Sequence, residues 1–115
     1  MYLSPLESSL LWLGIEDYTG LWDALHEVRS VLPNLSDLDA KHKARAIVSD
    51  LAHRNLIALY RCIGTLASGQ IAEVVRGEVD SVLEDEHSWE TPQAPFEESI
   101  WFAATEVGEL QYHRS

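Results

Sequence analysis

Apolar residues recur at intervals of three and four in the N-terminal half of the chain, and this spacing predicts three helices. The first helix is expected over about 6–13. Ser4 is a candidate N-cap, Pro5 suits the first helical position, and Glu7 stands where a capping box needs its carboxylate. Gly14 then predicts the end of this helix.

The second and third helices are predicted over about 17–32 and 37–55. Pro33 supplies the stop of the second helix, and Ser36 is the candidate N-cap of the third. Each helix should turn a stripe of apolar side chains towards the core. The expected stripes are Leu21, Trp22, Leu25, Val28 and Leu32 in the second helix, and Leu38, Ala44, Ile47, Val48 and Leu51 in the third.

Two short segments rich in apolar and aromatic residues predict strands at 57–63 and 99–105, paired as an antiparallel hairpin. Strand alternation sends Trp101 and Phe102 to opposite faces, so only one of these rings can enter the shared core. The other ring needs a cover, and the fourth helix and a partner chain are the two alternatives. Cys62 is expected to be a small core residue of the first strand.

A fourth helix is predicted over 70–85, between the two strands, because its apolar residues follow a helical period. A final helical turn is expected over 106–112. The apolar positions of the fourth helix are Ile71, Val74, Val75, Val79, Val82 and Leu83.

Three helices followed by two strands resemble the winged-helix version of the helix-turn-helix domain. The segments that carry the resemblance are LAHRNLIALYR at Leu51–Arg61 and the later FAATEVG. The resemblance implies a mainly α fold with a small β-hairpin (α+β), in which an additional helix joins a winged-helix-like three-helix core within one domain, 1–115. Residues 64–98 depart from the family pattern, because an acidic helical insertion stands where a short wing is expected.

The composition is typical of a soluble globular protein, with 46% hydrophobic and 23% charged residues. Nineteen acidic and eight basic side chains leave a net charge of -11, which opposes attraction to nucleic acid or an anionic membrane and suits a basic partner. The sequence has no run as long as a membrane span and no signal-peptide pattern. Cys62 is the single cysteine, which excludes an intrachain disulfide and fits a reducing, cytoplasmic setting.

Carboxylates gather in the second half of the chain, where eleven of them lie over 73–109 against Arg76 alone. Three of these carboxylates recur at i, i+7 and i+11 along one face of the predicted fourth helix. Such a face is explained either by solubility or by a cationic partner. The candidate partner-binding residues are Glu73, Asp80, Glu84, Glu97 and Glu98.

The winged-helix resemblance implies a different interface, on the third helix, where basic residues would face a DNA groove. A solvated helix face is the simpler explanation of the same residues. Asp37 and Asp39 at the start of this helix oppose DNA binding, as does the acidic insertion. The candidate DNA-binding residues are Lys41, His42, Lys43 and Arg45.

No pattern in the sequence points to catalysis, a cofactor or a metal. It lacks a nucleophile elbow, a catalytic-cysteine signature and a glycine-rich phosphate loop, and its five histidines lack metal-ligand spacing. The leading hypothesis is a non-enzymatic, acidic protein-binding domain, in concrete form an immunity- or antitoxin-type inhibitor of a basic, nuclease-like partner. The alternative is a winged-helix DNA-binding transcriptional regulator. The partner's identity and the choice between monomer and homodimer stay open.

Overall fold

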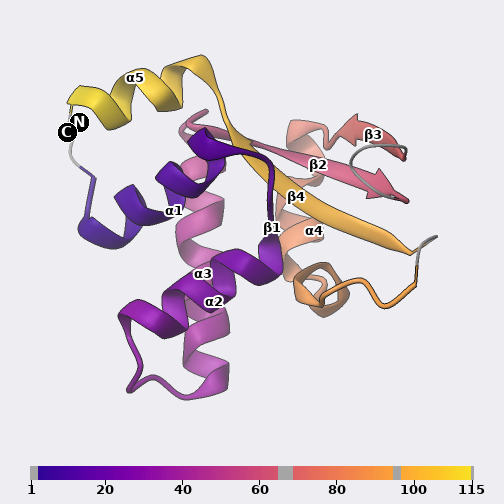
Figure 1. Cartoon of the computed structure of the whole chain (residues 1–115), viewed down its shortest axis with the longest axis horizontal. Coiled ribbons are helices and arrows are strands. Elements are labelled where there is room, and N and C mark those ends of the chain that lie inside the picture. Colours follow the sequence, from indigo (N-terminus) through magenta and orange to yellow (C-terminus); the bar gives the residue numbers. More distant parts are fainter. Residues whose placement is uncertain (1–2, 65–68, 95–96, 115) are drawn as a thin grey trace.

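The computed structural model describes residues 3–64, 69–94 and 97–114. Five helices and four strands are interspersed along the described residues of the chain (Figure 1). The elements are α1 (Pro5–Glu16), β1 (Thr19–Gly20), α2 (Leu21–Val31), α3 (Asp37–His53), β2 (Ile57–Ile63), β3 (Gln70–Glu73), the short 3-10 turn η1 (Arg76–Glu78), α4 (Val79–Glu84), the 3-10 turn η2 (Glu86–Trp89), β4 (Glu98–Ala104) and α5 (Glu106–Arg114).

The four strands form one antiparallel sheet in the order β1-β4-β2-β3. The predicted hairpin is confirmed, because β2 and β4 pair from Ile57 opposite Ala104 to Ile63 opposite Glu98. The α+β class is therefore confirmed as well. The hairpin is not a two-stranded unit, since β1 extends it on one side and β3 on the other.

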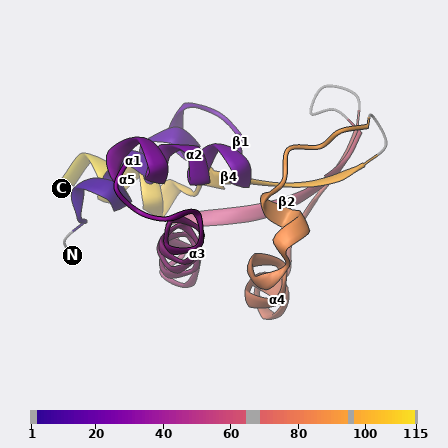
Figure 2. The same cartoon turned by 90° about the horizontal axis from the view of Figure 1, so that it is seen from below.

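Helices α3 and α4 lie on the same side of the sheet (Figure 2). The sheet face towards them carries the deepest core side chains, including the fully buried ring of Phe102 beside Leu59. The opposite faces expected for Trp101 and Phe102 are confirmed, because Phe102 is buried and Trp101 is only half-buried. Within the chain the cover on Trp101 is Trp22, whose ring packs edge-on against it, and α4 lies on the other side of the sheet, so the fourth helix was the wrong alternative; the partner chain stays a prediction. Cys62 is buried, as expected.

Two helix starts follow the sequence closely. The Ser4 hydroxyl accepts a hydrogen bond from the Glu7 amide, and the Glu7 carboxylate accepts one from the Ser4 amide, which completes the predicted capping box. The Ser36 hydroxyl caps α3 by accepting from the Asp39 amide. The helix ends where Asn55 adopts a left-handed backbone conformation, with φ of 60°, which asparagine tolerates better than most residues.

The predicted C-terminal end of the first helix and the predicted start of the second helix were wrong. Helix α1 continues through Gly14 to Glu16. A side chain at position 14 would press on the backbone nitrogen of Ala104, so the role of the glycine is to permit close packing of α1 on β4. Helix α2 begins at Leu21 and not at 17, because Thr19–Gly20 pairs with β4 as β1.

Two residues assigned to the core stripes were also placed wrongly. Leu38 is 62% exposed in the first turn of α3, where no other element covers it. Trp22 is half-buried on the side of the sheet opposite Phe102, because Trp101 supplies its contact there.

The predicted helix over 70–85 was wrong in its first half, so the insertion at 64–98 is not purely helical. Gln70–Glu73 forms the edge strand β3, and only Val79–Glu84 is α-helical. β-branched residues such as Ile71 suit a strand as well as a helix, and pairing with β2 decided between the two. Residues 65–68 and 95–96 of the insertion lie outside the described part of the chain.

The final helical element is longer than predicted, because α5 runs through Glu106–Arg114. No helix within the described residues is both long enough and apolar enough to cross a membrane.

Candidate partner-binding surfaces

The five acidic candidates do not form one helix face. Glu73 lies on β3, whereas Asp80 and Glu84 lie on α4, so the predicted periodic face along a single helix was wrong. The reason is the strand pairing of β3, which places Glu73 directly beside Tyr60 of β2.

Asp80 is engaged with α3. Its Oδ1 lies 2.8 Å from His53 Nε2 and accepts a 3.4 Å hydrogen bond from the Ser49 hydroxyl. The hydrogen bond to His53 lowers the pKa of the Asp80 carboxyl below its ordinary value of 3.8. Asp80 therefore joins α4 to α3 and is not a freely presented charge.

Glu97 and Glu98 also make internal contacts. Glu98 pairs with the Arg61 guanidinium at 2.9 Å, and Glu97 lies 3.1 Å from His87 while accepting a hydrogen bond from the Gln93 amide. Within the described residues, Glu73 and Glu84 are exposed and have no ion pair, so these two of the five candidates are free to meet a partner.

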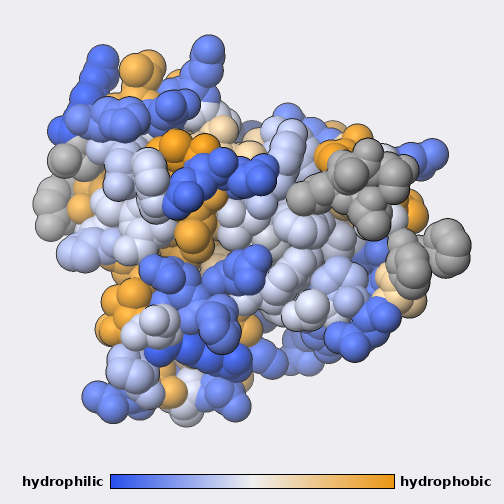
Figure 3. Space-filling model, viewed as in Figure 1, coloured by the Kyte–Doolittle hydropathy of each residue, from blue (hydrophilic) through white to orange (hydrophobic). Residues whose placement is uncertain are grey.

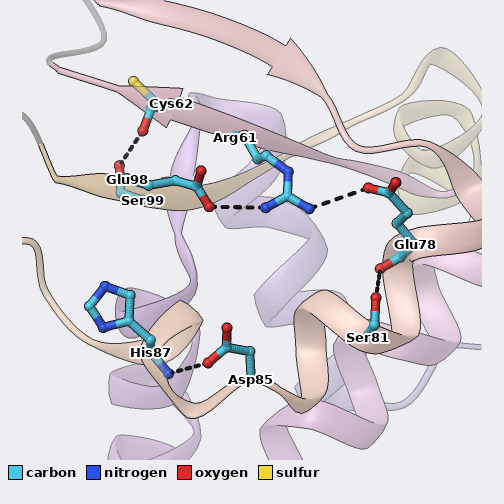
Figure 4. Close-up of polar contacts among 8 residues, drawn as sticks. All are labelled: Arg61, Cys62, Glu78, Ser81, Asp85, His87, Glu98 and Ser99. Carbon is cyan, nitrogen blue, oxygen red and sulfur yellow. Dashed lines mark hydrogen bonds and ion pairs between the residues drawn. The ribbon is translucent and has the colours of Figure 1, made fainter.

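A small hollow lies between the sheet and the segment that contains α4 and η2, with a volume of about 180 Å³. Arg61 dominates its polar lining and reaches from β2 to Glu98 and to Glu78 (Figure 4). On the other wall, Asp85 caps η2 by accepting from the His87 amide. Arg61 thus has two carboxylate partners, and the Asp85 carboxylate has a backbone amide as its partner. Across the described residues, no group of three His, Cys, Asp or Glu side chains could hold a metal ion.

The basic candidates on α3 are divided between two environments. Arg45 donates from Nε to the backbone carbonyl of Leu83 at 3.0 Å, so its guanidinium supports the end of α4. Lys41 is half-buried, while His42 and Lys43 are exposed. Helix α4 thus covers one side of α3 and leaves only part of the candidate DNA-binding surface open.

The surface has a large excess of negative charge that the fold does not neutralise. Five of the nineteen carboxylates pair with arginine, three contact histidine, and the other eleven have no such partner within the described residues. Five of the eight basic side chains, all arginines, are held by internal contacts. Unpaired carboxylates are therefore the dominant charged groups available to a partner.

Sequence analysis missed a cluster of four aromatic rings on the sheet face that points away from α4, here called the aromatic face. Tyr60 and Trp101 are direct cross-strand partners there. Tyr18 packs edge-on against Tyr60 with ring centroids 5.2 Å apart, and Trp22 packs likewise against Trp101 at 4.9 Å. The pairing of β2 with β4 was predicted but its register was not, and the register is what places Tyr60 beside Trp101.

The aromatic face borders on Glu73. Burial raises the pKa of the Tyr60 phenol above its ordinary value of 10.0, and the neighbouring Glu73 charge raises it further. Figure 3 shows the molecule from this side, where the area over the sheet is mostly pale, with both hydrophilic and hydrophobic side chains around it. The rings therefore have a carboxylate, that of Glu73, beside them.

Comparisons with known proteins give no relative for this chain: no family model, no curated protein and no solved structure matches it significantly. The functional argument consequently depends on the residues and geometry described above.

Proposed function

We propose that this chain is a non-enzymatic domain that binds a basic partner protein. The observation that carries the proposal is the set of eleven carboxylates without an ion pair within the described residues, alongside a net charge of -11. A surface of this kind accelerates association with a positively charged protein and disfavours polyanions. An immunity- or antitoxin-type inhibitor, which would cover the basic substrate cleft of a nuclease-like partner, is the concrete form of the proposal.

We also propose that the fold is an elaborated winged helix. The element order α1-β1-α2-α3-β2-β4 and the central position of β4 between β1 and β2 support this proposal. The segment over 64–98, with β3 and α4, replaces a short wing. The buried Cys62 accords with a cytoplasmic setting.

The structure gives the DNA-binding alternative less support. In a winged helix the exposed face of the third helix meets DNA, but here Asp80 is held against α3 by His53. A phosphate backbone approaching α3 would meet this carboxylate and those of Asp37 and Asp39 at the helix start. The open basic residues, Lys43 among them, are too few to offset that repulsion.

The decisive experiment is capture of a partner from the source cells, followed by kinetics with the purified partner. We expect a protein with a basic binding surface, whose association rate falls by about tenfold or more as salt rises from low to physiological levels. Replacing both Glu84 and Glu86 with Lys should slow association, while replacing both with Asp keeps the charge and should leave the rate unchanged. Both side chains are exposed and have no ion pair within the described residues.

Two outcomes would contradict the proposal. One is a purified partner whose association does not depend on salt. The other is sequence-selective binding of duplex DNA tighter than about 100 nM at physiological salt that is abolished by Lys43→Glu, because specific DNA-binding proteins reach this range.

A further inference from the structure

The aromatic face is built from four separate elements of the chain and is held rigidly. Tyr60 and Trp101 lie side by side on β2 and β4, while Tyr18 and Trp22 come from the turn before β1 and from α2. The ring planes of the two packed pairs meet at 84° and 79°. Edge-to-face pairs of this kind fix the rings and leave part of each π surface pointing outwards.

The indole N–H of Trp101 already has a hydrogen-bond partner within the chain. The Trp101 indole N–H donates to the Ser99 hydroxyl at 2.8 Å, and that hydroxyl donates to the carbonyl of Cys62 at 3.4 Å. The indole therefore offers a ligand its ring surface and not its N–H group. Tyr18 is 40% exposed and the other three rings are half-buried, so the rings are within reach of a partner.

The strand register places a carboxylate on this face. Glu73 is the cross-strand neighbour of Tyr60 and is exposed. Arg61 is the basic residue of β2, and alternation places it on the opposite face, where it pairs with glutamates across the hollow. The strand positions that share the aromatic face carry no basic side chain within the described residues.

We propose that the aromatic face binds arginine side chains of the partner protein, an inference that rests on the proposed function. An arginine guanidinium stacks on tyrosine and tryptophan rings and is attracted by their π electrons, while the neighbouring Glu73 carboxylate supplies the charge complement. A second copy of this chain is the weaker candidate, because each copy has a net charge of -11 and self-association through this face would bring the two Glu73 carboxylates close together.

The four tryptophans provide a test with its own internal control. Trp22 and Trp101 lie on the aromatic face, whereas Trp12 stacks on Tyr112 and Trp89 is buried with its N–H bonded to a backbone carbonyl. In an NMR titration of the isotope-labelled full chain with a peptide of six arginines at low salt, the indole N–H signals of Trp22 and Trp101 should shift. The signals of Trp12 and Trp89 should stay in place. A six-lysine peptide should bind more weakly than the six-arginine peptide, by about threefold or more.

Matched variants separate ring contacts from general charge attraction. Trp22→Leu and Glu73→Gln should each weaken binding of the arginine peptide by about threefold. The controls are Trp12→Leu, an exposed ring away from this face, and Glu109→Gln, an exposed carboxylate on α5, and both should leave the affinity unchanged. Unchanged indole spectra of the free variants outside the substituted site will show that each variant is folded.

The possible failures are distinguishable. If the arginine peptide does not bind even at low salt, recognition of a basic partner fails and the proposed function fails with it. If the peptide binds but Trp22 and Trp101 do not respond, or if Glu109→Gln weakens binding while Glu73→Gln does not, the proposed function stands and the aromatic face is the wrong surface. Equal affinity for the lysine and arginine peptides would likewise overturn this inference. So would indole shifts that depend on protein concentration alone, because these would indicate self-association of the chain.

Discussion

Replacing Gly108 with alanine should destabilise the protein, although alanine is the better helix former. In an unconstrained helix this change would stabilise by about 1 kcal/mol. Here the added Cβ would overlap the carbonyl oxygen of Leu56 and lie 2.8 Å from its carbonyl carbon, and neither backbone atom can rotate away. The same carbonyl accepts a hydrogen bond from the Thr105 amide at 3.0 Å. Helix α5 must therefore move outwards.

Moving α5 removes specific contacts. Overpacking of this kind costs about 1–3 kcal/mol, and loss of the Trp12 and Tyr112 stack adds about 1 kcal/mol, so the net loss after the helix-propensity gain is about 2 kcal/mol. Urea denaturation, monitored by tryptophan fluorescence, measures this loss in the free energy of unfolding. Gly77→Ala is the matched control, because a side chain there meets nothing within 4 Å, and it should be neutral or stabilising. A Gly108→Ala protein as stable as the unaltered chain would refute this account of how α5 packs.

Two further perturbations test the ion pairs and the core. The Arg54 hydrogen bond lowers the pKa of Asp50 below 3.8, so this pair stabilises the fold above about pH 4, and the stabilisation is lost as pH falls through the folded-state pKa. The stability that Arg54→Met loses relative to the unaltered chain should therefore be smaller at about pH 2.5 than at about pH 6. An equal loss at the two pH values would contradict the pairing. Phe102→Ala should lower the free energy of unfolding, measured by urea denaturation, by about 3–5 kcal/mol because the ring is fully buried. Ile63→Ala, at a position 48% exposed, should lower it far less, and comparable losses would show that the core is placed wrongly.

Local signals in the sequence were sufficient for part of the fold. Ser4 and Ser36 predicted helix starts because their hydroxyls satisfy nearby amides, an interaction that needs no tertiary structure. The pairing of 57–63 with 99–105 was also predictable, since both segments are rich in strand-forming residues. Strand β1 was not, because two residues are too few to show any periodicity.

The acidic and aromatic surfaces differ in how far the sequence could define them. The proposed acidic face assumed that Glu73 belongs to a helix, and the β-branched residues around it fit both helical and extended periods, so only pairing with β2 could decide. The aromatic face depends on Trp22, whose helical spacing matched a core stripe. Its true neighbour, Trp101, is far away in the chain, and sequence periodicity carries no information about such a contact.

The insertion between β2 and β4 has a consequence for the order of folding. Thirty-four residues separate Ile63 from Glu98, and closing a loop of that length costs about 2 kcal/mol more than closing a four-residue turn, since each doubling adds about 0.6 kcal/mol. β2 and β3 are much closer to each other in sequence than β2 and β4 are, so β2 and β3 can pair first. Docking of α4 on α3 through Asp80 and His53 then shortens the remaining search, so we expect β4 to join β2 after β3 has done so, and β1, which pairs with β4 alone, to enter the sheet no earlier than β4.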